Sequence, residues 1–303
     1  MDLAFVKMHR LGNDYIYLDG FEQDLSGLDL AGLAPCLADR HFAIGGDGLI
    51  AVLPPDPGVD AAGRMRMFNA DGSEGQMCGN GLRCVAKLLI DAGHAEPQGS
   101  GQALRIQTGA GVLTVGVTRG DAGQVESVAV DMGVPVFEPS RVPVRPDAEG
   151  VLSVERVDSM TRLVVDGPEG EPLVLDCVSF GNPHAVLRVK QLALVDAARL
   201  ASLGRFVETH PAFPERVNLH LIEPIDRGRV NVLHWERGSG ATLACGTGAS
   251  AVVVATILAG ETERHVVTAL PGGELQIDWD AETGHVTMTG PATRVFDGRI
   301  RLP

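Results

Sequence analysis

Two short segments that each place a cysteine before glycines offer the clearest chemistry in this sequence. They read MCGNG at positions 77–81 and ACGTG at positions 244–248, and each opens an apolar run. These runs predict helices, so each thiol stands at a helix start. The unpaired N–H groups and the dipole there favour the thiolate of a group whose ordinary pKa is about 8.5. We therefore expect one of Cys78 and Cys245 to act as a base near neutral pH.

The glycines after each cysteine extend this chemistry. They leave backbone N–H groups open to an anion, so two facing helix starts can hold and polarise a substrate carboxylate. A thiolate on one side of the adjacent carbon and a thiol on the other can remove a proton and return one with inverted configuration. One such segment is a weak signal, because free cysteine is often buried in the core. Two copies with parallel flanks favour two-base proton transfer.

The other three cysteines carry no such signal. Cys84 lies two turns inside a predicted helix, and Cys36 and Cys177 lie in apolar surroundings, so we expect all three in the core. Five cysteines form an odd set with no CxxC pair. This usage predicts free thiols in the reducing cytoplasm and argues against a metal site.

The elements that must position the two thiols point to a duplication. Asn13 follows Gly12 and lies 65 residues before Cys78, while Asn182 follows Gly181 and lies 63 residues before Cys245. Each half then offers an alternating strand, a polar loop, the cysteine segment and a helix. We predict two similar α+β domains with the site in a cleft between them.

The domain limits follow from the same alignment. A proline-rich stretch from Met132 to Pro146 is the expected crossover. The first domain is predicted over residues 1–133 and the second over 134–290, with the last strand, 291–303, returning to the first.

Net charge and hydropathy limit the kinds of binding partner that we expect for this chain. The formal net charge is −14, and the 25 lysines and arginines are scattered. Nucleic acid requires a clustered positive surface, so we expect a small-molecule substrate. The longest apolar stretch, around Ala249–Ala259, is shorter than the roughly 20 residues that span a bilayer, so no membrane association is expected.

The lysines bear on the cofactor. Amino-acid racemases commonly use pyridoxal phosphate, which requires a lysine and a phosphate cradle. Only Lys7, Lys87 and Lys190 are present, and none lies in a clear glycine-rich phosphate loop. We expect a mechanism without a cofactor.

At this point the sequence resembles the diaminopimelate epimerase family. The resemblance covers nearly the whole chain, in the family's order. Its motifs are Met8–Tyr15, Phe68–Glu74, Cys78–Cys84, Gly181–His184, Glu215–Asn218, Glu236–Gly238, Ala244–Ala249, Leu270–Gly273 and Thr289–Ala292.

The resemblance implies a pyridoxal-independent epimerase that interconverts L,L- and meso-diaminopimelate on the route to lysine and peptidoglycan. It implies a homodimer, and domains that each wrap a curved, mostly antiparallel sheet around a central helix. Cys78 and Cys245 would be the acid and base, with His184 and Glu236 as the supporting pair. The substrate-binding residues carried over are Asn13, Asn69, Gly79, Asn80, Asn182, Asn218, Glu236, Arg237, Gly246 and Thr247. An arginine and several amides suit a distal carboxylate and ammonium.

Two positions depart from the family pattern. Position 10 is arginine where the family usually has glycine, which would change the packing or charge beside Asn13. Position 48 is glycine where some members have a glutamine that contacts the substrate. The glycine at position 48 puts one expected substrate contact in doubt, but it does not put the expected reaction in doubt.

Four alternatives remain open on the sequence. A cofactor-independent racemase of another amino acid, of the proline or histidine racemase type, would keep the fold, but Asn69, Asn218 and Arg237 favour a substrate with a second head group. A phenazine-biosynthesis-like isomerase is expected to lack both thiols. A thiol redox sensor using Cys78 and Cys245, or a non-catalytic binding module, would not exchange the α-proton of diaminopimelate with solvent.

Overall fold

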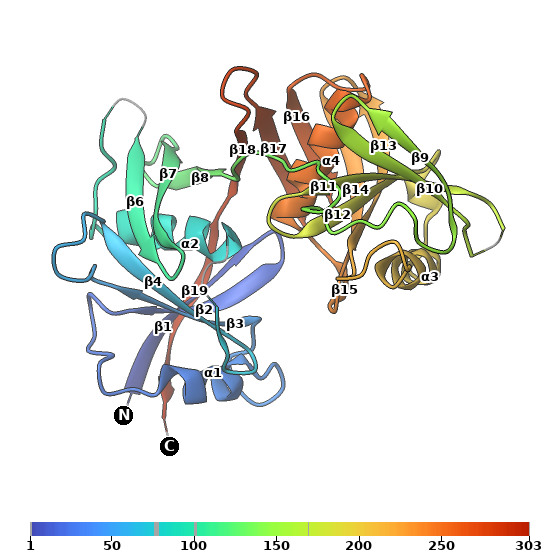
Figure 1. Ribbon diagram of the computed structural model, residues 1–303. Helices are drawn as coiled ribbons and strands as arrows, with labels where there is room; N and C mark the ends of the chain where they lie inside the picture. The colour runs from blue at the N-terminus through green and yellow to red at the C-terminus, as the bar shows by residue number, and fades with distance from the viewer. Residues whose placement is uncertain (1, 76–78, 100–101, 169, 303) are drawn as a thin grey trace. The chain divides into compact units, whose positions relative to one another are not determined.

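The computed structural model describes residues 2–75, 79–99, 102–168 and 170–302, with the backbone alone at positions 79 and 80. The chain forms two compact units. The first comprises Met1–Val130 with Thr289–Pro303, and the second comprises Asp131–Met288 (Figure 1). No helix in the described ranges has the length and apolar character needed to cross a membrane.

The first unit is a sheet with a helix on each face. Its strands are β1 (Asp2–Arg10), β2 (Asn13–Asp19), β3 (Gly48–Leu53), β4 (Gly63–Asn69), β5 (Glu74–Gly75), β6 (Ala103–Thr108), β7 (Gly111–Arg119), β8 (Val125–Asp131) and β19 (Thr293–Arg301). They pair in the order β19–β1–β2–β3–β4–β6–β7–β8, and β5 also pairs with β4. Of these pairs, β2 with β3 and β4 with β6 run parallel.

Two helices bury the faces of this sheet. Helix α2 (Gly79–Asp91) packs against β1, β3, β4, β6 and β7, and every side chain from Gly81 to Ile90 is buried. A helix buried all round needs strands on several sides, so the sheet curves around it. Helix α1 (Leu30–Ala38) packs on β2, β3 and β4, and the Asp29 side chain accepts a hydrogen bond from Gly32 N at its start.

Cys36 corrects one expectation, because its side chain is exposed and not in the core. The buried positions of α1 are Leu30, Ala34, Leu37 and Ala38. Their spacing defines one face of the helix, and Cys36 lies off that face. The expectation for Cys84 and Cys177 is confirmed, since both are buried.

The second unit repeats the same arrangement. Its strands are β9 (Val151–Val157), β10 (Met160–Val165), β11 (Leu173–Ser179), β12 (Pro183–Arg188), β13 (Asn218–Asp226), β14 (Arg229–Glu236), β15 (Gly240–Thr242), β16 (His265–Leu270) and β17 (Gly273–Trp279), and β18 (Val286–Pro291) leads on to β19. They pair in the order β9–β10–β11–β12–β13–β14–β16–β17, and β15 also pairs with β14. Of these pairs, β12 with β13 and β14 with β16 run parallel.

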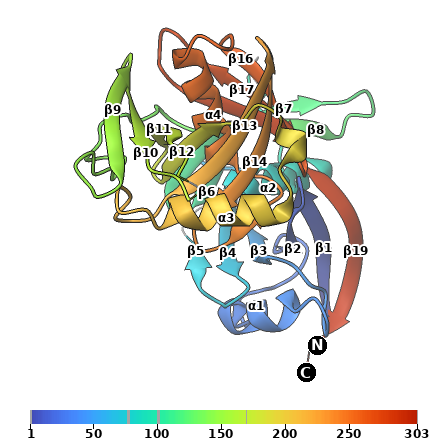
Figure 2. The ribbon, with the colours of Figure 1, turned by 90° about the vertical axis from the view of Figure 1, so that its right-hand side faces the viewer.

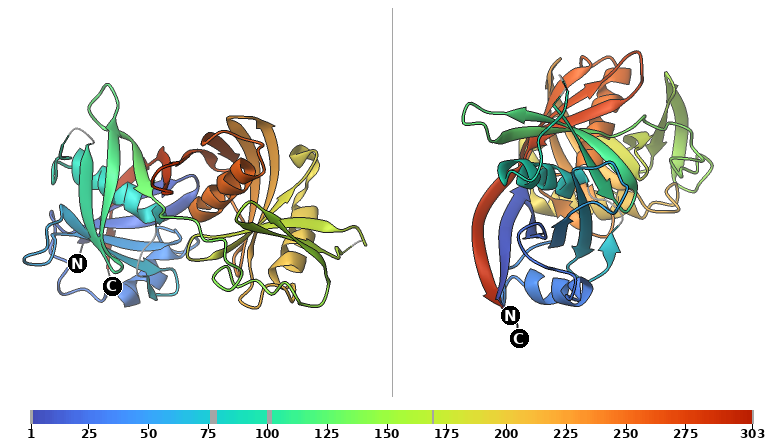
Figure 3. Two further views of the ribbon diagram at one scale, coloured as in Figure 1. Left: turned by 45° about the horizontal axis from the view of Figure 1, so that its top comes forward. Right: turned by 90° about the vertical axis from the view of Figure 1, so that its left-hand side faces the viewer.

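The helices of the second unit also lie on opposite faces. Helix α3 (Ala197–Glu208), preceded by the short turn η1 (Leu192–Leu194), packs on β13, β14 and β15 (Figure 2). Helix α4 (Gly246–Leu258) runs alongside strands β11 to β14, β16 and β17 (Figure 3). The parallel pairs and the two helices fall at matching places in both units, so the predicted α+β fold of two similar halves is confirmed.

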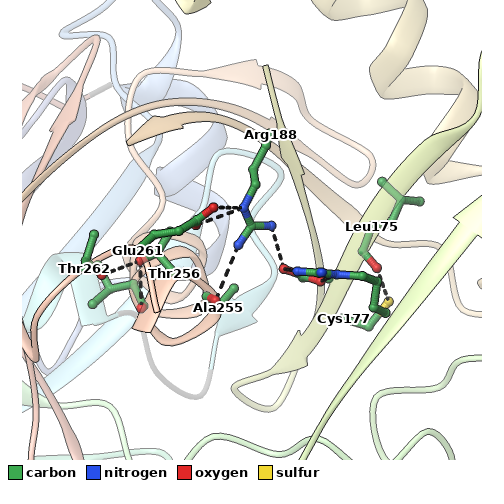
Figure 4. A network of polar contacts seen from close by, with 10 residues as sticks. Leu175, Cys177, Arg188, Ala255, Thr256, Glu261 and Thr262 are labelled. Atoms are coloured by element: carbon green, nitrogen blue, oxygen red, sulfur yellow. Dashed lines mark hydrogen bonds and ion pairs between the residues drawn. The ribbon is translucent and has the colours of Figure 1, made fainter. Parts of the chain in front are cut away.

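An ionic cluster ties the sheet of the second unit to the end of α4. Asp176 on β11 is fully buried, and both of its oxygens are held by Arg162, at 2.6 and 3.0 Å. Arg188 on β12 donates to Asp176 at 2.6 Å and to Glu261 at 2.7 Å, as Figure 4 shows for Glu261. A buried carboxylate needs such partners, because an uncompensated buried charge costs several kcal/mol. The neighbouring Cys177 faces the apolar core, where burial raises the pKa of its thiol well above the ordinary range.

Candidate active site

Cys245 stands at the start of helix α4. It is the N-cap residue, in an extended conformation with φ −133° and ψ 115°, and its carbonyl accepts the first helical hydrogen bond from Ala249 N at 2.9 Å. The predicted place of this cysteine, before glycines at a helix start, is confirmed. The side chain is only 5% exposed, so the thiol lies in a nearly dry environment.

The ionisation of Cys245 differs from the expectation for a helix start. Burial, followed by the charge of Glu236, raises the pKa of this thiol to about 12. The hydrogen bonds with the Thr247 side chain and Gly248 N lower the pKa but do not offset burial. Cys245 is therefore a neutral thiol at physiological pH.

Polar side chains of α4, of β12 and of the turn before β12 lie beside the helix start. The hydroxyl of Thr247 lies 3.5 Å from the sulfur of Cys245, and Asn182 Nδ2 donates to this hydroxyl oxygen at 3.3 Å. His184 Nε2 lies 3.0 Å from Asn182 Oδ1. Burial, followed by the electrostatic effects of His234 and Arg237, lowers the pKa of His184 to about 3, so its ring is neutral.

The ends of β13 and β14 supply a second group. Asn218 accepts from Arg237 N at 3.0 Å and donates to Pro183 O at 2.9 Å. The Arg237 side chain donates to Glu215 O at 2.9 Å and is half-buried. Glu236 accepts from Thr242 at 2.6 Å, and its charge raises the pKa of the Cys245 thiol.

The second unit thus brings together eight of the residues named from the sequence. They are Asn182, His184, Asn218, Glu236, Arg237, Cys245, Gly246 and Thr247.

Sequence reasoning missed two histidines beside this group. His220 on β13 and His234 on β14 are direct cross-strand partners, and their rings are joined by a hydrogen bond of 2.7 Å. The His220 ring is joined in turn to His184 by a hydrogen bond of 2.8 Å. The signal was present in the alternation of Leu219, His220 and Leu221, because alternate strand residues face opposite sides of a sheet. The leucines belong to the core on the α3 side, and the His220 ring contacts Gly248 of α4 on the other side.

In the first unit, Asp47 links Asn13 to Ala70, the residue after Asn69. Asn13 Nδ2 donates to Asp47 Oδ2 at 2.7 Å, and Ala70 N donates to Asp47 O at 3.1 Å. The Oδ1 atom of Asn13 is buried and accepts no hydrogen bond from the described residues. Asn69 donates to Ser73 Oγ at 2.9 Å.

Two of the named residues, Gly79 and Asn80, begin helix α2. Cys78 lies outside the described residues. The backbone of Gly79 begins helix α2 and Asn80 follows it, just as Gly246 begins α4 directly after Cys245.

The structure shows the surroundings of the two positions that depart from the family pattern. Arg10, at the end of β1, is 1% exposed and is among the largest fully buried side chains. Gly48 begins β3, where a Cβ would lie 2.2 Å from Phe68 O and 3.1 Å from Asn69 Cα. This backbone conformation therefore excludes a side chain at position 48, and the glutamine of other members has no counterpart here.

A family model described as diaminopimelate epimerase matches residues 5–138 and 177–295. The diaminopimelate epimerase of Acetivibrio thermocellus is 44% identical over 300 residues, covering 99% of both chains. That of Desulfitobacterium hafniense is 45% identical, covering 98% of this chain and 97% of the relative. That of Methanococcus maripaludis is 40% identical, covering 99% of this chain and 100% of the relative.

Solved structures show the shared fold. A phenazine biosynthesis protein of the PhzF family from Bacillus anthracis superposes with a TM-score of 0.68 at 15% identity, covering 100% of both chains. A probable proline racemase from Agrobacterium radiobacter gives 0.63 at 18% identity, covering 99% of this chain and 93% of the other. The family match and the full-length relatives confirm the resemblance found in the motifs, and the chain belongs to the diaminopimelate epimerase family of isomerases.

Proposed function

We propose that this protein interconverts L,L- and meso-diaminopimelate by proton transfer between two thiols and the α-carbon, without pyridoxal phosphate. The observation that carries the proposal is the Cys245 thiol, held at the start of α4 among the side chains that the family pattern assigns to this reaction. Family membership and relatives with this name over the full chain support the substrate.

Cys245 is proposed as the acid in the resting enzyme. Its raised pKa keeps the proton on sulfur until a carbanion forms nearby. The thiolate left behind is then stabilised by the Thr247 hydroxyl, by Gly248 N–H and by the positive end of α4. Cys78 is proposed as the base that removes the proton from the opposite face, and the roles reverse in the reverse reaction.

Substrate binding is proposed to use the amides and the arginine. The N–H groups at the starts of α4 and α2 suit the α-carboxylate, which is the usual anion at a helix N-terminus. Arg237 can bind the distal carboxylate through its guanidinium, supported by Asn218 and Glu215. The Oδ1 of Asn13, which accepts no hydrogen bond from the described residues, suits an ammonium donor.

Two further proposals concern the compartment and the oligomeric state of the protein. We infer a cytoplasmic homodimer; the exposed Val295 and Phe296 on β19 are large apolar side chains that a partner copy could cover. Light scattering of the purified protein tests the dimer.

The deciding experiment follows exchange of the α-proton. Incubating L,L-diaminopimelate with the reduced enzyme in deuterium oxide, without pyridoxal phosphate, should give meso product and deuterium at the α-carbon. Cys78→Ala and Cys245→Ala should both abolish product formation, whereas Cys36→Ala, at an exposed cysteine, should not. Retained epimerisation in Cys245→Ala would refute the assignment.

A further inference from the structure

Three fully buried imidazoles form a line that leads to the polar residues beside Cys245. His234 Nδ1 lies 2.7 Å from His220 Nδ1, and His220 Nε2 lies 2.8 Å from His184 Nδ1. Each of the three side chains is 0% exposed. The family pattern includes His184, but it assigns nothing to His220 or His234.

The direction of these hydrogen bonds follows from the Asn182 amide. Its Oδ1 only accepts, so His184 Nε2, at 3.0 Å, carries the hydrogen and donates. A neutral imidazole protonated at Nε2 accepts at Nδ1, and therefore His220 Nε2 donates to His184. By the same rule His220 accepts at Nδ1, and His234 donates from Nδ1.

The rings of His184 and His220 must be neutral for this order to hold. Burial is the main cause that lowers the pKa of His184 to about 3 and the pKa of His220 well below its usual value. Both rings therefore keep one hydrogen at physiological pH, and each bond between rings uses a single hydrogen.

The same direction continues to the sulfur. Asn182 Nδ2 donates to Thr247 Oγ1 at 3.3 Å, so this oxygen is used as an acceptor. The single hydrogen of the Thr247 hydroxyl is then available for the sulfur of Cys245, 3.5 Å away. Every donor in the line, from His234 to Thr247, points toward Cys245.

We propose that His220 and His234 are positioning residues for proton transfer by Cys245. They fix the Nε2–H tautomer of His184 and, through Asn182, leave the Thr247 hydroxyl to donate to the sulfur when it becomes a thiolate. The inference depends on the proposed function only for the role of Cys245 in proton transfer.

The packing of His220 supports this role. A Cβ on Gly248 would lie 2.5 Å from His220 Cε1, so the ring lies directly against the first turn of α4. The glycine at this position therefore makes room for the imidazole beneath the helix start that carries Cys245. In such a dry site a hydrogen bond to a developing charge is stronger than in water, and aligned bonds polarise one another.

Nitrogen NMR on the reduced, unmodified enzyme tests the direction without any variant. Spectra of the histidine ring nitrogens distinguish a nitrogen that carries hydrogen from one that does not. We expect hydrogen on Nε2 of His184, on Nε2 of His220 and on Nδ1 of His234. Hydrogen on Nδ1 of His184 would reverse the line and overturn the proposal.

Substitution of His220 tests the consequence. His220→Leu removes the donor to His184, so the Thr247 hydroxyl is no longer held toward the sulfur, and kcat should fall about 10- to 100-fold with KM little changed. His220→Gln offers an Nε2 donor in nearly the same place and should restore most of kcat. Equal kcat in folded His220→Leu and wild type, or equal losses in the leucine and glutamine variants, would refute the positioning role.

His265→Leu is the matched control. His265 lies on β16 of the same unit, its side chain is 63% exposed and its partner is Asp278, so this variant should match wild type. Failure of the unmodified enzyme to exchange the α-proton of diaminopimelate would refute the proposed function instead, and the ring-nitrogen spectra would still decide the direction of the line.

Discussion

At Cys245, a helix start and nearly complete burial act on one thiol in opposite directions. The N–H groups of α4 and the Thr247 hydroxyl favour the thiolate, whereas burial and the Glu236 charge favour the thiol. Burial has the larger effect, because removing a charge from water costs more than a partial dipole returns. Cys245 is therefore protonated at rest, and hydrogen-bond donors already lie in place for the thiolate that loss of this proton would leave.

Glu236→Gln should lower the pKa of Cys245, because it removes the negative charge that raises it. At a fixed pH between 8 and 10 the thiolate fraction then rises, and alkylation of Cys245 by iodoacetamide should become faster, by roughly tenfold for each pKa unit. Mass spectrometry of the modified peptide measures the rate, with the exposed Cys36 as internal reference. An unchanged rate ratio between the two cysteines would show that Glu236 does not set this ionisation.

Arg237→Ala should impair binding more than turnover. A guanidinium bound to a carboxylate is worth about 2–3 kcal/mol, so KM for diaminopimelate should rise about 30- to 150-fold, with kcat affected less. Arg237→Lys should recover only part of the loss, because an ammonium lacks the paired donors. Steady-state kinetics measure both constants, and a wild-type KM in Arg237→Ala would place the distal carboxylate elsewhere.

At the scale of elements, the sequence could predict features that neighbouring residues mark, but not those that depend on the register of β12, β13 and β14. The helix start at Cys245 was predictable because glycines and an apolar run mark it locally. The line of His184, His220 and His234 was not, since it depends on the register of three strands far apart in the sequence. The pKa of Cys245 was unpredictable for the same reason, because its burial and its distance to Glu236 are set by tertiary packing.

The ionic cluster of β10, β11 and β12 should be a stability determinant. Asp176→Ala leaves Arg162 and Arg188 facing each other without the fully buried carboxylate between them, so unfolding free energy should fall by about 3–5 kcal/mol. Urea titration of the second unit's fluorescence measures the change. Glu263→Ala, which breaks an exposed pair with Arg227, should cost less than about 1 kcal/mol. Equal effects of the two substitutions would contradict this ranking.

At the scale of the molecule, two halves share one order of elements, and the duplication was readable in the sequence as repeated spacing. The turns at Gly12 and Gly181 both have positive φ, 88° and 85°, and each glycine directly precedes a predicted substrate-binding asparagine. Such turns favour glycine and thus leave a sequence signal. The exposure of Cys36 left none, because an apolar neighbourhood does not reveal which face of a short helix is buried.

The C-terminal strand should be required by the first unit. Strand β19 pairs with β1 from Thr293 opposite His9 to Arg301 opposite Asp2, and Phe296 packs edge-on against Phe5 with ring centroids 5.9 Å apart. Deleting residues 293–303 exposes the hydrogen-bonding edge of β1 and removes this contact. Hydrogen exchange of the β1 amides should become at least about tenfold faster, while the amides of α4 keep their protection.

The control for this deletion is Arg301→Ala. It breaks an ion pair with Asp2 whose side chains are 85% and 55% exposed, so exchange in β1 should stay near wild type. Protection of β1 that survives the deletion would mean that β2 alone holds this strand. Loss of protection in β1 and α2 together would instead show that the last residues of the chain complete the sheet around the first central helix, as the pairing of β19 with β1 requires.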